Sequence, residues 1–249
     1  MIRSLGLRLF KANRYLAGLV GEWRMGLGST KLDLMREYEA ATERYHLWYY
    51  NSGVASAVRF LGTPATKSVS DLWNYQEILV EIRPSLVVEF GTQHGGSALF
   101  FKTMLAQIAP RYRVLTVDID HSIVDEALRR DPAIEFMTCS SADPRVAQRI
   151  RELRDEYPGP VFFILDSDHR MHHVHAELML IRPLTRAGDY VIVEDSNVNG
   201  HPVLPGWGAG PYEATERYLA EYPQDYQRDV QREHKFGFTF APNGFLIRR

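Results

Sequence analysis

Acidic residues end two apolar runs in the second half of the chain. VFFILD ends in Asp166, and VIVED ends in Glu194 and Asp195 one strand–helix–strand step later. This separation places the three carboxylates side by side at the ends of adjacent parallel strands. Clustered carboxylates raise one another's pKa unless a cation joins them. Hard oxygen ligands select magnesium or a similar ion, so a magnesium site at Asp166, Glu194 and Asp195 is predicted.

Four histidines follow Asp166 in the stretch HRMHHVH. His169 is expected at the start of the next helix, close enough to take a proton from a metal-bound hydroxyl. Its ordinary pKa suits a general base near neutral pH, so it is the predicted catalytic residue. A zinc site from His169 and His173 is the alternative that the spacing leaves open. Asp168 is interpreted as a further metal ligand or a helix N-cap.

The other histidines fall on a predicted helix whose apolar stripe faces the sheet; the stripe is Met171, Val174, Leu178 and Ile181. His172 and His175 lie to one side of this stripe, and His173 can pair with Glu177 one turn further on. These three are therefore interpreted as solvated or packing residues.

The first strand of this region ends in VVEFGTQHGGS. Its glycines permit a tight turn and a close approach of ligand to backbone, but the spacing is not G-x-G-x-x-G. The carboxylate of Glu89 suits a cationic ligand such as the sulfonium and amino group of S-adenosylmethionine. The next strand ends in Asp118, placed to accept hydrogen bonds from a ribose diol, and a third ends in TCSSAD. The predicted cofactor-binding residues are Glu89, Gly91, Thr92, Gly95, Ser97, Asp118, Ser141, Ala142 and Asp166.

The surrounding pattern indicates two parts. Residues 1–83 read as a helical extension and lid, with helices in LDLMREYEAATERYHLWYY and DLWNYQEILVEIR. In residues 84–249, short apolar runs alternate with amphipathic stretches, which is typical of βαβ units and a parallel sheet. HKFGFTF, APNG and FLIRR predict a terminal antiparallel hairpin. The expected fold is α/β, with the Rossmann-like sheet of a class I methyltransferase as the cofactor-binding domain.

Composition narrows the class of protein. The net charge of −2 argues against a nucleic-acid binder, and the single cysteine, Cys139, fits a reducing compartment. No apolar run reaches the length of a bilayer span, so a cytoplasmic location is expected. Residues 1–32 suggest a basic amphipathic helix. Two interpretations stay open: a peripheral position at the inner membrane face, or packing on its own domain or on a partner subunit. A homo-oligomer is expected.

Residues for the acceptor are sought in the loops. NGHPVLPGWGAGPYEA follows the predicted metal strand, where Trp207 suits stacking on a sugar ring and His201 suits hydrogen bonds to hydroxyls. A structured crossover with Trp207 in the core is equally compatible with this segment. HLWYYNSG and TPATKSVSDLW indicate a lid from the other side, with Tyr49, Lys67, Ser68 and Trp73 as candidates.

LWNYQEIL, SLVVEFGTQHGGSALFF, ILDSDH, VIVEDSNVNGHPVLPG and KFGFTFAPNGFLIRR together resemble the rhamnosyl O-methyltransferase / cephalosporin hydroxylase family. The resemblance runs from about residue 40 to the end. It is strongest to the bacterial rhamnosyl O-methyltransferases that modify cell-envelope glycolipids. The wider metal-dependent O-methyltransferases imply the same magnesium site and a base at the position of His169. In other branches that base is often lysine and the last metal ligand often asparagine.

The function expected from these features is a magnesium- and S-adenosylmethionine-dependent O-methyltransferase acting on a sugar hydroxyl of a glycolipid or glycosylated natural product. Alternatives are a methyltransferase for a non-sugar hydroxyl, such as a β-lactam or phenolic metabolite, and a non-catalytic nucleoside-binding protein. A monooxygenase is disfavoured, because no 2-His-1-carboxylate set is visible at the strand ends.

Overall fold

The computed structural model describes residues 31–249, of which His46 to Arg249 make one compact unit. The basic helix expected at the N-terminus falls almost entirely on residues 1–30, outside the described residues, and stays a prediction. The helix expected in LDLMREYEAATERYHLWYY is confirmed as α2 (Lys31–Asn51). Among the described residues, no helix combines the length and apolarity needed to span a bilayer.

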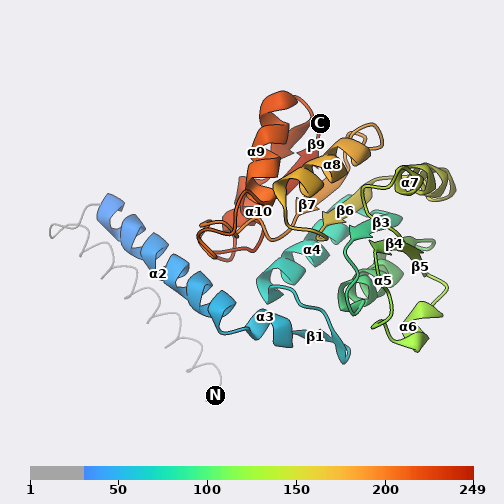
Figure 1. The fold of residues 1–249 in the computed structure, drawn as a ribbon, viewed down its shortest axis with the longest axis horizontal. Coiled ribbons are helices and arrows are strands. Elements are labelled where there is room, and N and C mark those ends of the chain that lie inside the picture. Colours follow the sequence, from blue (N-terminus) through green and yellow to red (C-terminus); the bar gives the residue numbers. More distant parts are fainter. Residues whose placement is uncertain (1–30) are drawn as a thin grey trace, which may run out of the picture. The chain divides into compact units, whose positions relative to one another are not determined.

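A seven-stranded sheet in the order β5-β4-β3-β6-β7-β9-β8 forms the centre of the larger unit (Figure 1). The first five strands in this order pair in parallel, and β9 runs antiparallel to both of its neighbours. The strands are β3 (Leu86–Phe90), β4 (Arg113–Asp118), β5 (Ile134–Thr138), β6 (Val161–Leu165), β7 (Tyr190–Val193), β8 (Tyr226–Arg228) and β9 (Phe245–Arg248). The predicted α/β class with a mostly parallel sheet is confirmed.

Helices cover both faces of the sheet because its parallel strands are apolar on both sides. On β3, Val88 packs in the core shared with α7, α8 and α9, whereas Val87 packs in the core shared with α4, α5 and α6. These helices are α4 (Val69–Ile82), α5 (Gly96–Ile108), α6 (Glu126–Arg129), α7 (Pro144–Glu156), α8 (Met171–Ile181) and α9 (Pro211–Glu221). The shorter elements are α3 (Val54–Ala57), β1 (Arg59–Phe60), β2 (Thr63–Pro64) and α10 (Val230–His234).

Helix α4 belongs to the same core as the sheet. Its Tyr75 and Leu79 are fully buried with residues of α5 and the central strands. The boundary predicted after residue 83 therefore falls inside the compact unit that begins at His46. The division of function between the two predicted parts stays a prediction.

The predicted hairpin is wrong in its first strand. FLIRR does form β9, but its partner on the outer side is β8, and HKFGFTF is not a strand. The cause is a competing partner for the backbone: Asp71 on α4 accepts hydrogen bonds from Phe240 N (2.9 Å) and Thr239 Oγ1 (2.6 Å). Phe238 and Phe240 pack beside Tyr49 instead of pairing with a neighbouring strand.

The Asp71 anchor predicts a pH-dependent stability. Burial, followed by the charge of Glu194, raises the pKa of Asp71 from 3.8 to about 7 in the folded protein. The unfolded chain therefore loses this proton at lower pH, and the stability contributed by protonated Asp71 is lost as the pH rises from about 4 to 7. Across this window we expect the free energy of unfolding to fall, relative to Asp71→Asn, by about 4 kcal/mol.

Urea unfolding at pH 4, 5, 6 and 7 measures this difference. Asp155→Asn, which changes an exposed carboxylate on α7, serves as the control and should run parallel to the unaltered protein. If the free energy of unfolding of Asp71→Asn and of the unaltered protein changed with pH in parallel, the raised pKa of Asp71 would be contradicted.

Candidate active site

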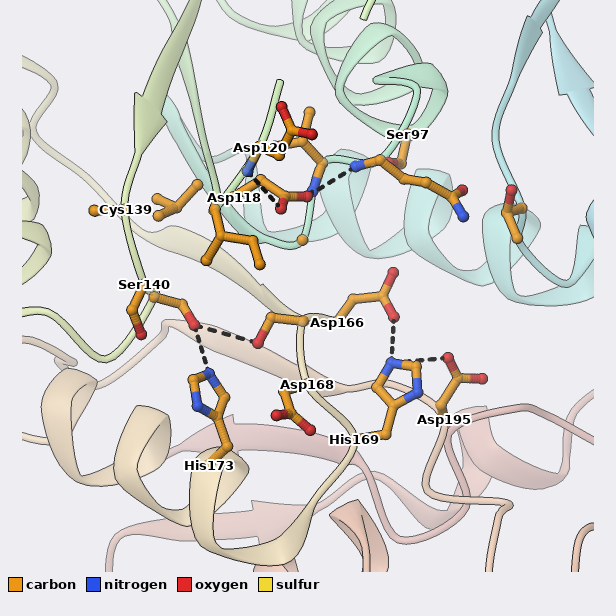
Figure 2. A pocket seen from close by; sticks show the side chains of 18 of the residues that line it. Ser97, Asp118, Asp120, Cys139, Ser140, Asp166, Asp168, His169, His173 and Asp195 are labelled. Carbon is orange, nitrogen blue, oxygen red and sulfur yellow. Dashed lines mark hydrogen bonds and ion pairs between the residues drawn. The ribbon is translucent and has the colours of Figure 1, made fainter. Parts of the chain in front are cut away.

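A cavity of about 530 Å³ opens at the carboxyl ends of the parallel strands (Figure 2). Open α/β sheets bind ligands at this edge. Most of the predicted cofactor-binding residues line it: Gly91, Thr92, Ser97, Asp118, Ser141 and Asp166. Glu89, Gly95 and Ala142 are not on the lining. Glu89 is fully buried, because the alternation along β3 turns its side chain toward the α4 and α5 face.

The turn after β3 is built by Gly91 and closed by Asp118. Gly91 has φ of +95°, and a Cβ there would lie 1.9 Å from the backbone oxygen of Asp166, so only glycine fits. Asp118 Oδ2 accepts hydrogen bonds from the backbone N–H groups of Thr92 (2.8 Å) and Gln93 (3.0 Å). The carboxylate at the end of β4 thus fixes the glycine turn and still faces the cavity.

A chain of hydrogen bonds between side chains of β3, β4 and β5 and the loops that follow them supports this turn. Thr116 Oγ1 donates its single proton to Glu89 Oε2 (2.7 Å), so Thr92 Oγ1 must donate to Thr116 Oγ1 (2.6 Å). The proton between Thr92 and His121 then belongs to His121 Nε2 (3.0 Å), which leaves Nδ1 to accept from Thr138 (2.8 Å). Glu89 is the final acceptor of a chain that crosses three strand ends. Burial raises its pKa to about 7, although Lys67 lowers it.

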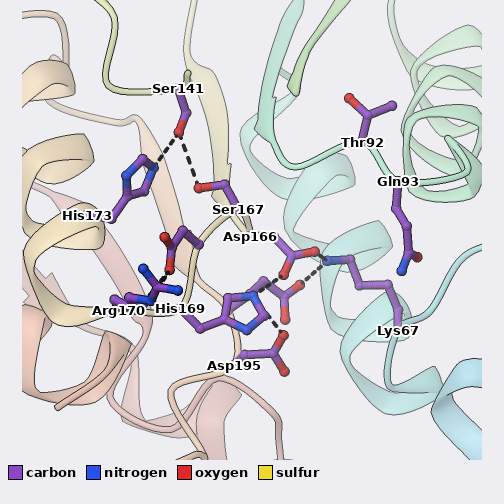
Figure 3. Close-up of polar contacts among 12 residues, drawn as sticks. Lys67, Thr92, Gln93, Ser141, Asp166, Ser167, His169, Arg170, His173 and Asp195 are labelled. Carbon is purple, nitrogen blue, oxygen red and sulfur yellow. Dashed lines mark hydrogen bonds and ion pairs between the residues drawn. The ribbon is translucent and has the colours of Figure 1, made fainter. Parts of the chain in front are cut away.

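Lys67 lies between two of the predicted metal ligands (Figure 3). Its Nζ pairs with Asp166 Oδ2 and lies 3.1 Å from Glu194 Oε1. Only 3% of the lysine side chain is exposed. Burial lowers the pKa of Lys67, but the carboxylates of Asp166 and Glu194 outweigh it and hold that pKa above its ordinary value. Lys67 is therefore a permanent cation within the carboxylate cluster.

Glu194 contacts two side chains that do not come from the strands of the sheet, Lys67 and Tyr75. Besides Lys67, it accepts a hydrogen bond from Tyr75 of α4 (2.7 Å) and is 3% exposed. Burial raises its pKa, and the nearby charge of Lys67 lowers it. Glu194 is not part of the group that the other two predicted metal ligands form with His169.

Asp166, His169 and Asp195 form a group whose ligand atoms lie within 4.8 Å of one another. His169 Nε2 is 3.4 Å from Asp166 Oδ1 and 3.3 Å from Asp195 Oδ2. Asp195 has φ of +50°, in the left-handed region that L-residues rarely adopt. Such strain is stored where a side chain must be aimed, and here it directs a carboxylate at the cavity.

The charges in this group act on one another. Burial lowers the pKa of His169, but Asp195 and Asp166 raise it to about 9. Burial raises the pKa of Asp195 to about 7, against the opposing effect of His169. Burial raises the pKa of Asp166, but Lys67 and His169 together outweigh it and hold that pKa below its ordinary value. With only these neighbours, His169 is a cation at neutral pH.

The other histidines divide differently from the prediction. The predicted pairing of His173 with Glu177 is confirmed (3.4 Å), and so is the buried apolar face of α8. His173 also lines the cavity, which its interpretation as a solvated or packing residue missed. His175 pairs with Glu221 on α9. Asp168 is not the N-cap of α8, because that position is Arg170, whose N–H it accepts (3.1 Å).

The residues expected to contact the acceptor lie in different environments. Trp207 is half exposed (51%), and its Nε1 donates to the backbone oxygen of His169 (3.4 Å), so it is not a core residue. His201 is stacked on Tyr212 and bound to Glu213. Tyr49 is buried in an aromatic cluster, and Trp73 is exposed on α4. None of the four lines the cavity.

Several lining residues were missed by the sequence interpretation. They lie at or within five residues of the carboxyl ends of β4, β5 and β6: Ile119, Asp120, Ile123, Cys139, Ser140 and Ser167. Ile119 is 76% exposed. An apolar residue in a loop right after Asp118, the predicted ribose ligand, is the signal that was available for it.

The fold is shared with solved methyltransferases. A CmcI structure with Mg and S-adenosylmethionine superposes with a TM-score of 0.63 at 21% identity, covering 78% of this chain and 77% of that one. A putative caffeoyl-CoA O-methyltransferase from Staphylococcus aureus superposes with a TM-score of 0.52 at 13% identity, covering 95% and 98%. The sheet order and the cavity at its carboxyl edge define a class I S-adenosylmethionine-dependent methyltransferase fold.

Sequence comparison gives the family. The model described as rhamnosyl O-methyltransferase/CmcI matches residues 52–249, and the chain belongs to this family. A rhamnosyl O-methyltransferase of Mycobacterium bovis is 56% identical over 213 residues, which cover 86% of this chain and 87% of the relative. One from Mycobacterium leprae is 55% identical over 216 residues, covering 87% and 94%. The protein is an S-adenosylmethionine-dependent O-methyltransferase, which confirms the predicted enzyme class.

The buried position of Lys67 predicts a large loss of stability on its removal. Lys67→Met leaves Asp166 and Glu194 buried without their cation, so we expect the free energy of unfolding to drop by about 3–5 kcal/mol. Lys102→Met, which removes a lysine paired with Asp131 on the surface, should cost under about 1 kcal/mol. Urea unfolding of both variants measures this. Adding Glu194→Gln to Lys67→Met should recover part of the loss, and equal losses for the two lysines would contradict the account.

Proposed function

We propose that this enzyme transfers the methyl group of S-adenosylmethionine to a rhamnosyl hydroxyl and requires magnesium. The observation that carries the proposal is the group Asp166, His169 and Asp195 at one end of the cofactor cavity. The two relatives above 50% identity, each named a rhamnosyl O-methyltransferase, support the choice of acceptor.

The donor atoms of this group fit a magnesium ion. Asp166 and Asp195 offer carboxylate oxygens, the ligands that magnesium prefers, and the cavity leaves room for water and acceptor oxygens. Glu194 remains a predicted ligand, and to serve as one it would have to exchange its bond to Lys67 for the ion. The zinc alternative is weaker, because His173 is not part of this group. When bound, magnesium would lower the pKa of an acceptor hydroxyl.

The proposed base is His169. Its Nε2 lies between Asp166 and Asp195, and both carboxylates raise its affinity for a proton. A divalent cation on the same carboxylates would oppose this effect and bring the pKa of His169 back toward neutrality, as a general base requires. His169 would hold the proton of the acceptor hydroxyl at Nε2 while the hydroxyl oxygen attacks the methyl group in line. The sulfur of the cofactor leaves with the electrons of its bond to that methyl.

The acceptor would lie on the side of the loop that carries Trp207. The exposed indole of Trp207 is tied to His169 through the hydrogen bond to its backbone oxygen, so a ring stacked on it would lie near the base. His201 is already bound to Glu213 and contributes to loop structure. A glycolipid as the carrier of the sugar, contact with the membrane surface, a cytoplasmic location and a homo-oligomer stay predictions.

Methyl transfer to defined acceptors tests the proposal. With methyl-labelled S-adenosylmethionine and magnesium, we expect label in a synthetic rhamnosyl glycoside with free hydroxyls and none in the same glycoside with every rhamnosyl hydroxyl already methylated. A catechol and a cephalosporin represent the non-sugar alternatives. Their kcat/KM should be lower by at least about 100-fold, because a site built to bind a polar substrate rejects one that leaves its groups unpaired. Preferred methylation of either would contradict the proposed acceptor.

Binding of Mn²⁺, followed by its electron paramagnetic resonance signal with magnesium as competitor, tests the metal site without relying on activity. Asp195→Asn replaces one anionic ligand by a neutral one, and we expect affinity to fall by about tenfold or more. Asp155→Asn on α7 is the matched control and should bind as the unaltered protein does. Unchanged affinity in Asp195→Asn would remove this residue from the site.

A further inference from the structure

A second polar cluster lies at the other end of the cavity from Lys67 (Figure 3). It joins Ser141, which follows β5, and Ser167, which follows β6, to His173 and Glu177 of α8. The two serines and His173 line the cavity, whereas Glu177 is completely buried behind them. The mechanism of methyl transfer does not use this cluster.

Glu177 fixes the direction of both serine hydroxyls. Ser141 Oγ and Ser167 Oγ (2.5 Å) each donate to the same oxygen, Glu177 Oε1. A serine hydroxyl has one proton, so neither has a second proton to offer a ligand. The contact between Ser141 Oγ and His173 Nε2 (2.9 Å) must then be donated by the histidine. Toward the cavity, both hydroxyls can act only as acceptors.

The position of this cluster matches the base of a nucleoside cofactor. Asp118, the predicted ribose ligand, and Ile119 line the cavity, and Cys139 and Ser140 lie next to the cluster in the chain. The group with Asp166, His169 and Asp195 is at the other end, where the methyl group must be delivered (Figures 2 and 3). The base therefore falls beside Ser141 and Ser167.

We propose that Glu177 is a specificity-determining residue that, through Ser141 and Ser167, selects a purine with a 6-amino group over one with a 6-oxo group. The inference rests on the proposed placement of S-adenosylmethionine in this cavity. An amino group donates hydrogen bonds and meets the two acceptor hydroxyls. An oxo group is itself an acceptor and would face their lone pairs, leaving a buried polar atom without a partner.

The energetics of Glu177 agree with a functional role. Its second oxygen, Oε2, is buried and has no hydrogen-bond partner within the described part of the chain. Burying a carboxylate with an unpaired oxygen costs stability that an apolar side chain of similar size would not. A residue retained for packing alone would avoid this cost, whereas one that orients two hydroxyls requires the acceptor.

Calorimetric binding of S-adenosylhomocysteine and its 6-oxo counterpart, S-inosylhomocysteine, tests the inference. The unaltered protein should bind the 6-amino compound at least about tenfold more tightly. In Glu177→Met, the hydroxyls are free to rotate and donate, so we expect this ratio to fall by about tenfold or more through tighter binding of the 6-oxo compound. Glu152→Met, an exposed change of the same type on α7, should leave the ratio unchanged.

Ser141→Ala supplies a second variant, to be used also if Glu177→Met does not fold. It removes one acceptor, so affinity for S-adenosylhomocysteine should fall and that for S-inosylhomocysteine should not. A ratio unaltered in the variants, or equal binding of the two compounds by the unaltered protein, would overturn the role of Glu177. Failure of the unaltered protein to bind either compound would instead contradict the placement of the cofactor.

Discussion

The ammonium group of Lys67, buried between Asp166 and Glu194, is the interaction on which the rest of the site depends. Carboxylates gathered at adjacent strand ends repel one another and cannot all remain charged in a buried setting without cations. Lys67 and protonated His169 supply two positive charges, which oppose the effect of burial that raises the pKa values of Asp195 and Glu89 to about 7. The carboxylates of the cluster would be stabilised in their charged form by a further cation, which is the physical reason to expect a divalent ion there.

Lys67 reaches this position from a part of the chain that is distant in sequence from Asp166 and Glu194. The lysine lies just before α4, whose Tyr75 holds Glu194 and whose Asp71 anchors the segment before β9. Helix α4 thus connects the carboxylate cluster, the C-terminal segment and the core of the sheet. On the cavity side, Gly91 allows the chain to pass close to Asp166, and the buried hydrogen bonds that end at Glu89 support the same turn.

The sequence predicted the features that depend on local pattern. Apolar runs in the sequence predicted the five parallel strands. The acidic residues at the ends of three of these runs predicted that Asp118, Asp166 and Asp195 meet at one edge of the sheet, where they line the cavity. It did not predict the partner of β9, because HKFGFTF has the alternation of a strand and only Asp71, far away in the chain, gives its backbone a different partner.

Partnerships across long separations explain the other differences. Lys67 was expected in a lid, and nothing in TPATKSVS indicates that its ammonium group is buried against Asp166. His173 was expected to pair with Glu177 and does, but its place on the cavity wall depends on where the loop after β5 brings Ser141. Such contacts are set by tertiary packing and leave no periodic trace in the sequence.

A crystal structure with S-adenosylhomocysteine and Mn²⁺, using the anomalous signal of the metal, tests the central claim most directly. We expect a metal peak between Asp166 and Asp195, the ribose on Asp118, and the sulfur of the cofactor directed toward the metal. A metal peak elsewhere, or a cofactor with its base at the end that holds His169, would contradict the central claim.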